Sequence, residues 1–173
     1  MGCDIHGYLE LVYSEDYVDG ICNIPHGRAY DWFGIIAGVR NYANATPISE
    51  PRGLPDEVSW EMKDEVKGYG PDGHSHSWLS YKDFKEYDWD QVSLDGRVST
   101  IDKETGKEKG KASYTWLQDD PEKCEEMGVE LKHLNRVAKD LVPYIWQGFL
   151  KFMEHLADKY GDEKVRIVFF FDN

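Results

Sequence analysis

The sequence predicts an α+β fold: a mostly antiparallel sheet of about five strands, packed by a long C-terminal helix. Residues 3–13 alternate polar and apolar side chains, and this period of two is typical of a strand. Residues 129–160 carry apolar side chains three or four positions apart, as one side of a helix does. Residues 164–173 contain an apolar run, which favours a strand buried on both faces at the centre of the sheet.

Local patterns predict the elements between these segments. Residues 14–25 are rich in turn formers, and residues 41–56 form a loop with three prolines. We expect short helices at 31–39, at 59–67, from a Ser80 cap to Tyr87, and from Pro121. We expect a hairpin of strands 92–101 and 111–117 with a charged tip at 104–107, a division or kink of the long helix at Pro143, and its end at Gly161.

Composition limits the class of protein. The chain has 173 residues and is expected to form a single domain, residues 1–173. Its net charge of −13 disfavours a protein that coats nucleic acid. Three cysteines without a CxxC motif argue against a disulfide scaffold and for a reducing compartment. We find neither a signal peptide nor an apolar run long enough to span a membrane, so we expect a cytoplasmic protein.

The first candidate site is the polar side of the opening strand. Asp4, His6, Tyr8 and Glu10 point to the same side of that strand, so two carboxylates and an imidazole can converge. Such a group is commonly part of a metal or acid–base site. The alternative is an ordinary solvent-exposed strand face. Cys3 points the other way, and we interpret it as a small buried residue.

The second candidate site is the segment Asp72–Trp78. Here Asp72, His74 and His76 follow one another at intervals of two residues in a glycine-rich loop. Imidazole suits zinc, iron, nickel or manganese. The alternative is a surface loop in which the histidines bind no ligand, with Trp78 in the core.

Two further features concern charge. Arg28, Arg40 and Arg52 are the only arginines in the first ninety residues, and guanidinium groups bind phosphate or carboxylate through two hydrogen bonds. For each of them, an ion pair within the protein is the alternative. Asp172 and Asn173 end the buried final strand, at a place where functional side chains often emerge from a sheet. His133 and His155 are assigned no role.

Several blocks spread along the chain resemble a family of small uncharacterised phage and bacterial proteins that begin with MGCDIH. The matching blocks are residues 1–6, 33–41, 47–55, 74–79 and 171–173. This resemblance implies a phage or prophage origin, and host cytoplasm as the location, without implying a reaction.

Shorter motifs resemble those of calcineurin-like metallophosphoesterases. Asp4-Ile5-His6-Gly7 is similar to their D-x-H motif, and Gly73-His74-Ser75-His76 is similar to their G-H-x-H motif. Residues 16–20 resemble the segment after their second strand. The chain departs from the family in lacking the N-H-[DE] motif, since Arg40-Asn41-Tyr42-Ala43 has no histidine. This resemblance implies metal chemistry rather than a fold.

The preferred hypothesis is a metal-dependent hydrolase, a phosphoesterase acting on a small anionic or nucleotide-like molecule. Asp4, His6, Asp72, His74 and His76 would bind one or two divalent ions, zinc or manganese. Glu10 or Asp172 would act as general base or orient a ligand histidine, and Arg40 and Arg52 would neutralise the substrate.

Two alternatives remain open. One is a non-enzymatic phage protein that sequesters a signalling nucleotide or blocks a host defence protein, where the acidic surface would suit a basic partner. The other is a structural protein of a virion. The metal hypothesis requires that residues 4–10 and 72–78 meet in space.

Overall fold

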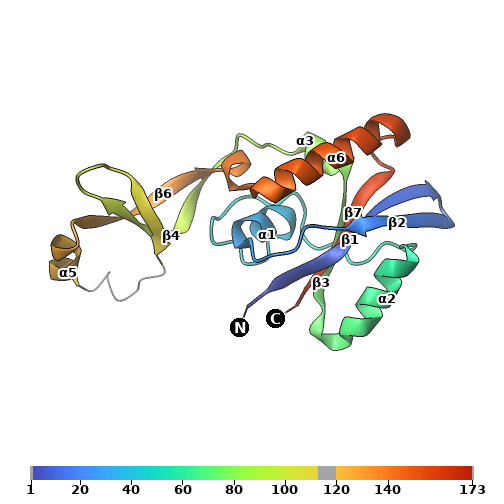
Figure 1. Ribbon diagram of the computed structural model, residues 1–173, viewed down its shortest axis with the longest axis horizontal. Helices are drawn as coiled ribbons and strands as arrows, with labels where there is room; N and C mark the ends of the chain where they lie inside the picture. The colour runs from blue at the N-terminus through green and yellow to red at the C-terminus, as the bar shows by residue number, and fades with distance from the viewer. Residues whose placement is uncertain (1, 113–119, 173) are drawn as a thin grey trace.

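The computed structural model describes residues 2–112 and 120–172 (Figure 1). It confirms an α+β fold with antiparallel sheets. The elements in chain order are β1 (Asp4–Ser14), β2 (Tyr17–Asn23), α1 (Tyr30–Ala37), α2 (Trp60–Tyr69), η1 (Gly70–Asp72), β3 (His74–Ser80), α3 (Tyr81–Glu86), β4 (Val92–Asp102), β5 (Glu108–Ala112), α5 (Pro121–Glu126), β6 (Val129–Val137), η2 (Ala138–Leu141), α6 (Tyr144–Tyr160) and β7 (Val165–Asp172).

The strands of the described residues form two sheets, so the prediction of one sheet of about five strands is wrong. The main sheet has four strands in the order β2-β1-β7-β3, and the small sheet has three in the order β5-β4-β6. The small sheet and α5 project from the main body as an arm, at the left of Figure 1. None of the helices in residues 2–112 and 120–172 has the length and apolar character needed to cross a membrane.

Strand β7 lies inside the main sheet, as its apolar sequence predicts. Residues 165–171 are all buried, and β1 and β3 flank the strand. Gly7 of β1 permits close approach to β7, because a Cβ at this position would lie 2.1 Å from the carbonyl oxygen of Val168. Its φ of 151° is also one that residues with side chains rarely adopt.

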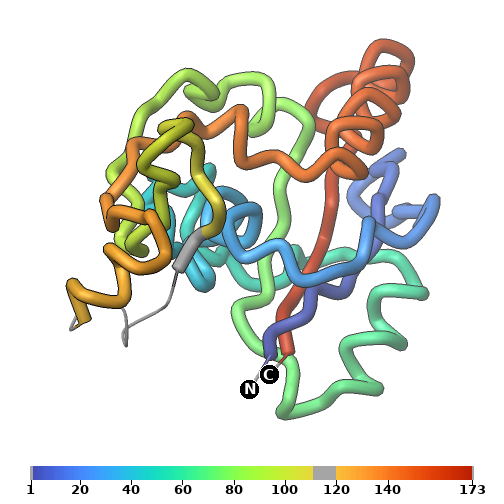
Figure 2. The backbone as a smooth tube through the Cα atoms, turned by 60° about the vertical axis from the view of Figure 1, so that its left-hand side comes forward, coloured from blue at the N-terminus to red at the C-terminus, as the bar shows by residue number. Residues whose placement is uncertain are grey.

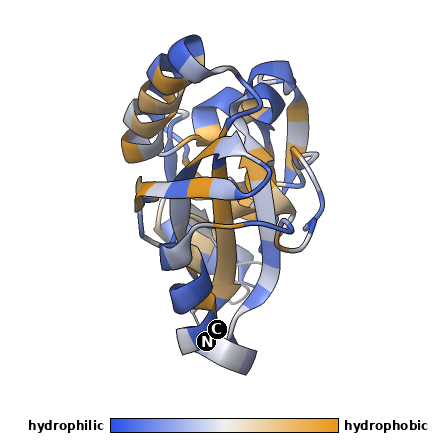
Figure 3. Ribbon diagram, turned by 90° about the vertical axis from the view of Figure 1, so that its right-hand side faces the viewer, coloured by the Kyte–Doolittle hydropathy of each residue, from blue (hydrophilic) through white to orange (hydrophobic). Residues whose placement is uncertain are grey.

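Different helices cover the two faces of the main sheet. Helices α1, α3 and α6 pack on the larger core, to which β7 contributes Phe169 and Phe171. Helix α2 covers a smaller core, which contains Met62 and Phe170. Side-chain alternation along β7 therefore sends Phe170 to the α2 face and its two neighbours to the α1 face. In Figure 3 the helices carry bands of both hydrophobic and hydrophilic residues, as helices with one buried side do.

The long helix predicted over residues 129–160 is wrong. The region contains β6, the short 3₁₀ helix η2 and the 17-residue helix α6. Val129 and Leu131 alternate with polar residues, as in a strand. The sequence of this region is therefore compatible with a strand and with the predicted helix. Pairing with the 11-residue strand β4 decides between the two. Pro143 does divide the region, because it stands between η2 and α6 as the residue before the first turn of α6. Its φ of −62° is compatible with that position.

Other local predictions are partly confirmed. The cap at Ser80 is a reciprocal capping box with Asp83, and Pro121 is the first residue of α5. The β4–β5 hairpin is present, although residues 113–117 of its predicted second strand lie outside the described residues. The turn-rich interpretation of residues 14–25 is wrong, because β2 pairs there with β1.

The small sheet contains a network of charged side chains. The carboxylate of Asp95 is fully buried and accepts hydrogen bonds from Arg97 Nε at 2.9 Å and Arg136 Nε at 3.0 Å. Arg97 also binds Asp31 of α1, and Arg136 binds Glu108 of β5. Burial raises the pKa of Asp95, but the hydrogen bonds from the two arginines outweigh it and lower the pKa to about 2. The network therefore ties the small sheet to α1.

Candidate functional site

Four separate segments meet at one end of the main sheet. β1 begins there, β7 ends there with Asp172 opposite Asp4, and β3 begins there. The last turns of α2 lie over this end, because Glu65 and Tyr69 both approach His6. Figures 1 and 2 show the two chain ends side by side at the same place. The side chains His6, Glu65, Tyr69, His76 and Asp172 form the sheet-end cluster.

His6 is the centre of the sheet-end cluster. Its Nε2 lies 3.3 Å from Asp172 Oδ2, and its Nδ1 lies 3.8 Å from Glu65 Oε1. The Tyr69 hydroxyl shares a hydrogen bond of 3.1 Å with Nδ1. The side chains of His6, Glu65 and Asp172 are 14%, 18% and 24% exposed, so the group is largely shielded from solvent. Both ring nitrogens of His6 therefore face oxygen atoms.

The His6 and His76 rings lie on either side of Phe170. Each ring centroid is 5.3 Å from that of Phe170. Because β7 lies between β1 and β3, the two imidazoles come from strands roughly 9–10 Å apart. An irregularity of β3 at Ser75, where φ is 51°, precedes His76. The two histidines share one face but do not converge on a single point.

His74 lies on the opposite face of the main sheet. It pairs with Phe171, and its ring centroid is 6.1 Å from the Phe171 ring, which belongs to the larger core. Cys3 is on this face too and is fully buried, as predicted. Burial raises the pKa of the Cys3 thiol, and a hydrogen bond with Arg40 opposes this. His74 and His6, which were predicted to be ligands of one metal site, therefore lie on opposite faces of the main sheet.

The two predicted aspartate ligands lie at the edge of the cluster or beyond it. Asp4 accepts two hydrogen bonds from Arg28, at 2.8 and 2.9 Å. The bonds from Arg28 lower the pKa of the Asp4 carboxyl. The backbone N–H of Asp4 donates to Asp172 Oδ1, so the ion pair adjoins the cluster. Asp72 is an exposed residue of η1.

Glu10 is engaged within the protein. It is fully buried, one oxygen accepts from Arg166 Nε at 3.0 Å, and the other accepts from the Ser59 backbone N–H at 2.7 Å. These bonds join β1 to β7 and to the start of α2. We therefore assign Glu10 a structural role.

Arg40 and Arg52 also lie away from the cluster. Arg52 donates to both oxygens of Asp83, at 2.8 and 3.0 Å, and its guanidinium lies 4.9 Å from the ring centroid of Trp78. Arg40 is on the His74 face, with its guanidinium 5.9 Å from the Tyr30 ring centroid. Arg28 is the arginine that the structure places beside Asp4 and the cluster.

Unpartnered polar atoms are concentrated at this end of the sheet. Six buried side-chain nitrogen or oxygen atoms of the described residues have no hydrogen-bond partner. Four of them are here: His6 Nε2, Glu65 Oε2, His74 Nε2 and His76 Nε2. Each such atom costs about 1–3 kcal/mol, and native proteins carry few of them. These four atoms lie at one end of the main sheet, with His74 on one face and the other three on the opposite face.

Burial also shifts the pKa values of three groups in this region. Burial raises the pKa of Glu65, with His6 and His26 opposing it. Burial lowers the pKa of His76, and neighbouring His74 lowers it further. Burial raises the pKa of the Tyr69 hydroxyl, and the charge of Asp172 adds to this. Each of these groups is thus biased towards its neutral form.

Sequence reasoning missed Glu65, Tyr69 and His26. A signal for the first two was present in α2, where Glu65 lies between Met62 and Tyr69 on the buried side of the helix. A carboxylate on the apolar side of a helix requires a partner. His26 is exposed in the loop before α1, with its ring centroid 6.4 Å from that of His6, and no local pattern marks it.

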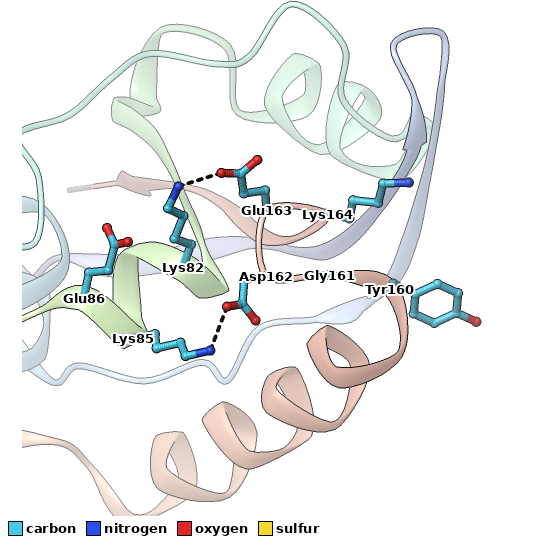
Figure 4. Close-up of a pocket in the computed structure, with 8 residues that line it drawn as sticks. All are labelled: Lys82, Lys85, Glu86, Tyr160, Gly161, Asp162, Glu163 and Lys164. Carbon is cyan, nitrogen blue, oxygen red and sulfur yellow. Dashed lines mark hydrogen bonds and ion pairs between the residues drawn. The ribbon is translucent and has the colours of Figure 1, made fainter.

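A hollow lies away from the sheet-end cluster, between α3 and the turn from α6 to β7 (Figure 4). Its volume is about 750 Å³. Lys82 binds Glu163 at 2.6 Å and Lys85 binds Asp162 at 2.9 Å across it. Its lining contains no histidine and none of the predicted site residues. Because these charges are paired with one another, we assign the hollow no binding role.

No three His, Cys, Asp or Glu side chains within residues 2–112 and 120–172 are placed to hold one metal ion together. Zinc or manganese binding therefore stays a prediction. Comparisons with protein-family models, with curated proteins and with solved structures find no match.

Proposed function

We propose that His6 and Asp172 bind a divalent metal ion and that the protein uses it to hydrolyse a phosphoester, as in a nucleotide-like substrate. The observation that carries this proposal is the pair formed by His6 Nε2 and Asp172 Oδ2. The two atoms lie 3.3 Å apart, and the buried nitrogen has no hydrogen-bond partner. The two groups are thus close together, but no hydrogen bond joins them.

The separation of these two atoms suits two ligands of one ion. Ligands of a tetrahedral ion at about 2.0–2.1 Å lie about 3.4 Å from each other, whereas a good N–H···O bond is about 2.9 Å long. An imidazole and a carboxylate together suit zinc or manganese. Two protein ligands leave positions open for water and substrate, whereas catalytic zinc centres usually have three protein ligands and one open position.

The surroundings of His6 also suit a metal ligand. Its other nitrogen is held by the Tyr69 hydroxyl at 3.1 Å, and ligand histidines are usually oriented through their second nitrogen in this way. Asp4 and Asp172 supply two carboxylates against the single guanidinium of Arg28, and Glu65, whose pKa is raised, adds a third carboxyl group. This balance favours a cation at the cluster.

Each neighbouring side chain has a role in this proposal. When bound, a divalent ion polarises a phosphoryl oxygen and makes water acidic enough to supply hydroxide at neutral pH. Arg28 would bind the phosphoryl group, in place of the predicted Arg40 and Arg52, because its side chain is 59% exposed beside the cluster. His76 would exchange a proton with the substrate, since its lowered pKa keeps the imidazole neutral at pH 7.

Hydrolysis of bis(p-nitrophenyl) phosphate by metal-stripped protein, with manganese or zinc added back, tests this proposal. We expect turnover only with added metal, and a loss of about 100-fold in the His6→Ala and Asp172→Asn variants. The His155→Ala variant is the matched control, because His155 is exposed on α6. Turnover that Asp172→Asn leaves unchanged, or the absence of turnover with either metal, contradicts the proposal.

A further inference from the structure

We propose that the sheet-end cluster accepts phosphodiesters in preference to phosphomonoesters, and that Asp4 sets this preference. The inference rests on the function proposed above and names the class of phosphoester. A phosphodiester carries one negative charge, whereas a phosphomonoester carries close to two at pH 7. The two classes therefore differ in how much positive charge the protein must offer them.

The guanidinium of Arg28 is already engaged within the protein. Its Nε donates to Asp4 Oδ1 at 2.8 Å, and its Nη2 donates to Asp4 Oδ2 at 2.9 Å. This pairing occupies one edge with which an arginine can bind a phosphate through two hydrogen bonds, and it neutralises the guanidinium charge. Gly2 packs against the same group, because a Cβ there would lie 2.4 Å from Arg28 Cζ and Nη1. Arg28 can therefore donate to a phosphoryl group, but it adds no net positive charge.

The other basic side chains near this end of the sheet do not replace that charge. Within residues 2–112 and 120–172, no lysine or arginine forms an ion pair with Glu65 or Asp172. Lys63 of α2 pairs with Glu57 instead, and Lys67 is exposed about 200° around the helix from Glu65. The guanidinium of Arg28 is thus the basic group that the substrate meets, and Asp4 accompanies it.

The balance of charge suits a substrate with one negative charge. With the divalent ion of the proposed function bound, the charges of that ion and of Arg28 face the carboxylates of Asp4 and Asp172. The site then carries one positive charge if the Glu65 carboxyl is protonated and none if it is ionised. Neither state matches a dianion. Unfavourable charge against a competing substrate is a common source of specificity.

The rim of the site leaves room for a second ester group. The side chains of Asp4 and Arg28 are 38% and 59% exposed, whereas those of His6 and Glu65 are only 14% and 18% exposed. A phosphoryl group that approaches from the side of Asp4 and Arg28 can therefore keep one of its ester groups in solvent.

Hydrolysis of a phosphodiester itself creates the disfavoured class. A water oxygen bonds to phosphorus, one ester P–O bond breaks, and a proton of the water goes to the departing alcohol. The hydroxyl left on phosphorus loses its proton near pH 6, so the product carries close to two negative charges at pH 7. We therefore expect the protein to release the monoester without cleaving it further.

The amount of p-nitrophenol released from bis(p-nitrophenyl) phosphate tests this inference. With manganese at pH 8, we expect one p-nitrophenol per substrate molecule, and a kcat/KM for p-nitrophenyl phosphate at least 10-fold lower than for the diester. In Asp4→Asn the ratio of the two kcat/KM values should move about 10-fold towards the monoester, because Arg28 regains its net charge. Asp90→Asn, which removes the exposed partner of Lys139, is the matched control and should leave the ratio unchanged.

Binding gives a readout that does not depend on turnover. Isothermal titration calorimetry of manganese-loaded protein at pH 8 compares diphenyl phosphate, a diester, with phenylphosphonate, a dianion without an ester bond. We expect the parent protein to bind diphenyl phosphate more tightly, and Asp4→Asn to reduce the difference in affinity about 10-fold.

The outcomes separate this inference from the function on which it rests. Release of two p-nitrophenol molecules per diester, or an unchanged ratio in folded Asp4→Asn, would overturn the inference and leave metal-dependent hydrolysis standing. The absence of turnover of either substrate would contradict the proposed function and the inference with it. Circular dichroism checks the fold of Asp4→Asn, and the number of p-nitrophenol molecules released by the parent protein decides the matter if that variant does not fold.

Discussion

The sheet-end cluster and the charge network of the small sheet both place carboxylates beside basic side chains where little of each side chain is exposed, yet they differ in how many of their polar atoms are hydrogen-bonded. In the network, both oxygens of Asp95 accept hydrogen bonds from arginines, and the pKa of Asp95 falls to about 2. In the cluster, Glu65 Oε2 and His6 Nε2 have no hydrogen-bond partner, although Asp172 Oδ2 lies 3.3 Å from His6 Nε2, and the pKa of Glu65 is raised.

This difference predicts different contributions of the two regions to stability. A buried charge whose partners are all present stabilises a particular arrangement of strands and is costly to remove. A buried polar group without a partner destabilises the protein. The two carboxylates should therefore respond in opposite directions to mutation and to pH.

Removal of Asp95 should have the strongest effect on stability. Asp95→Ala leaves Arg97 and Arg136 without their shared buried partner, and breaking a buried ion pair in this way costs about 3–5 kcal/mol. Urea unfolding followed by circular dichroism measures the loss. Asp90→Ala, which removes the exposed partner of Lys139, serves as the control and should change little. A loss below about 1 kcal/mol for Asp95→Ala would erase the contrast between the two regions.

Acid should destabilise the small sheet through the same residue. The pKa of Asp95 is about 2 in the folded protein, below its ordinary value of 3.8, so its contribution is complete above about pH 4. The contribution is lost as the pH falls from 4 to 2, and amounts to about 2 kcal/mol. Unfolding free energies of the parent and of Asp95→Asn over this range should converge towards low pH. Parallel curves would show that Asp95 does not titrate as described.

Substitution of Glu65 should act in the opposite direction. Its pKa is raised in the folded protein, so its charged form weakens the fold as the pH rises above the ordinary value of 4.5. In metal-stripped protein at pH 7, Glu65→Gln should therefore raise the free energy of unfolding by up to about 1 kcal/mol. Glu61→Gln, in the first turn of the same helix, is the matched comparison. If Glu65→Gln instead lowers the free energy of unfolding, the charged form of Glu65 stabilises the fold, as that of Asp95 does.

The hollow of Figure 4 should show the weakest response. Lys82 and Glu163 form an exposed pair, with side chains 46% and 73% exposed, and such pairs contribute little. Lys82→Gln should leave the urea midpoint and any metal-dependent activity unchanged. A clear shift of the midpoint would mean that surface charges also carry stability here, which would blur the comparison.

Sequence patterns predicted the fold where they depend on neighbouring residues and failed where they depend on distant ones. The alternation of residues 3–13, the apolar run of β7 and the Ser80 cap are local, and all three are confirmed. The helix predicted over 129–160 failed because pairing with β4 decides that region, and this partner is about 35 residues away in the sequence.

The same distinction applies to the site. The period of two in β1 placed Asp4, His6 and Glu10 on one face, but it could not show that Arg166 and Ser59 take up both oxygens of Glu10. Nor could the spacing of His74 and His76 show that they lie on opposite faces, because that depends on the irregularity of β3 at Ser75. Glu65 and Tyr69 come from α2, so only tertiary packing brings them to His6.

Long-range ¹H–¹⁵N NMR spectra of the histidine rings during a zinc titration test the central claim most directly. His6 should respond first, with a large change at Nε2 that saturates at one ion per chain and disappears in Asp172→Asn. His133 and His155, which lie outside the cluster, should stay unchanged and serve as internal references. A titration that perturbs all histidines alike, or that leaves His6 Nε2 unmoved while zinc binds elsewhere, would show that the sheet-end cluster is not a metal site.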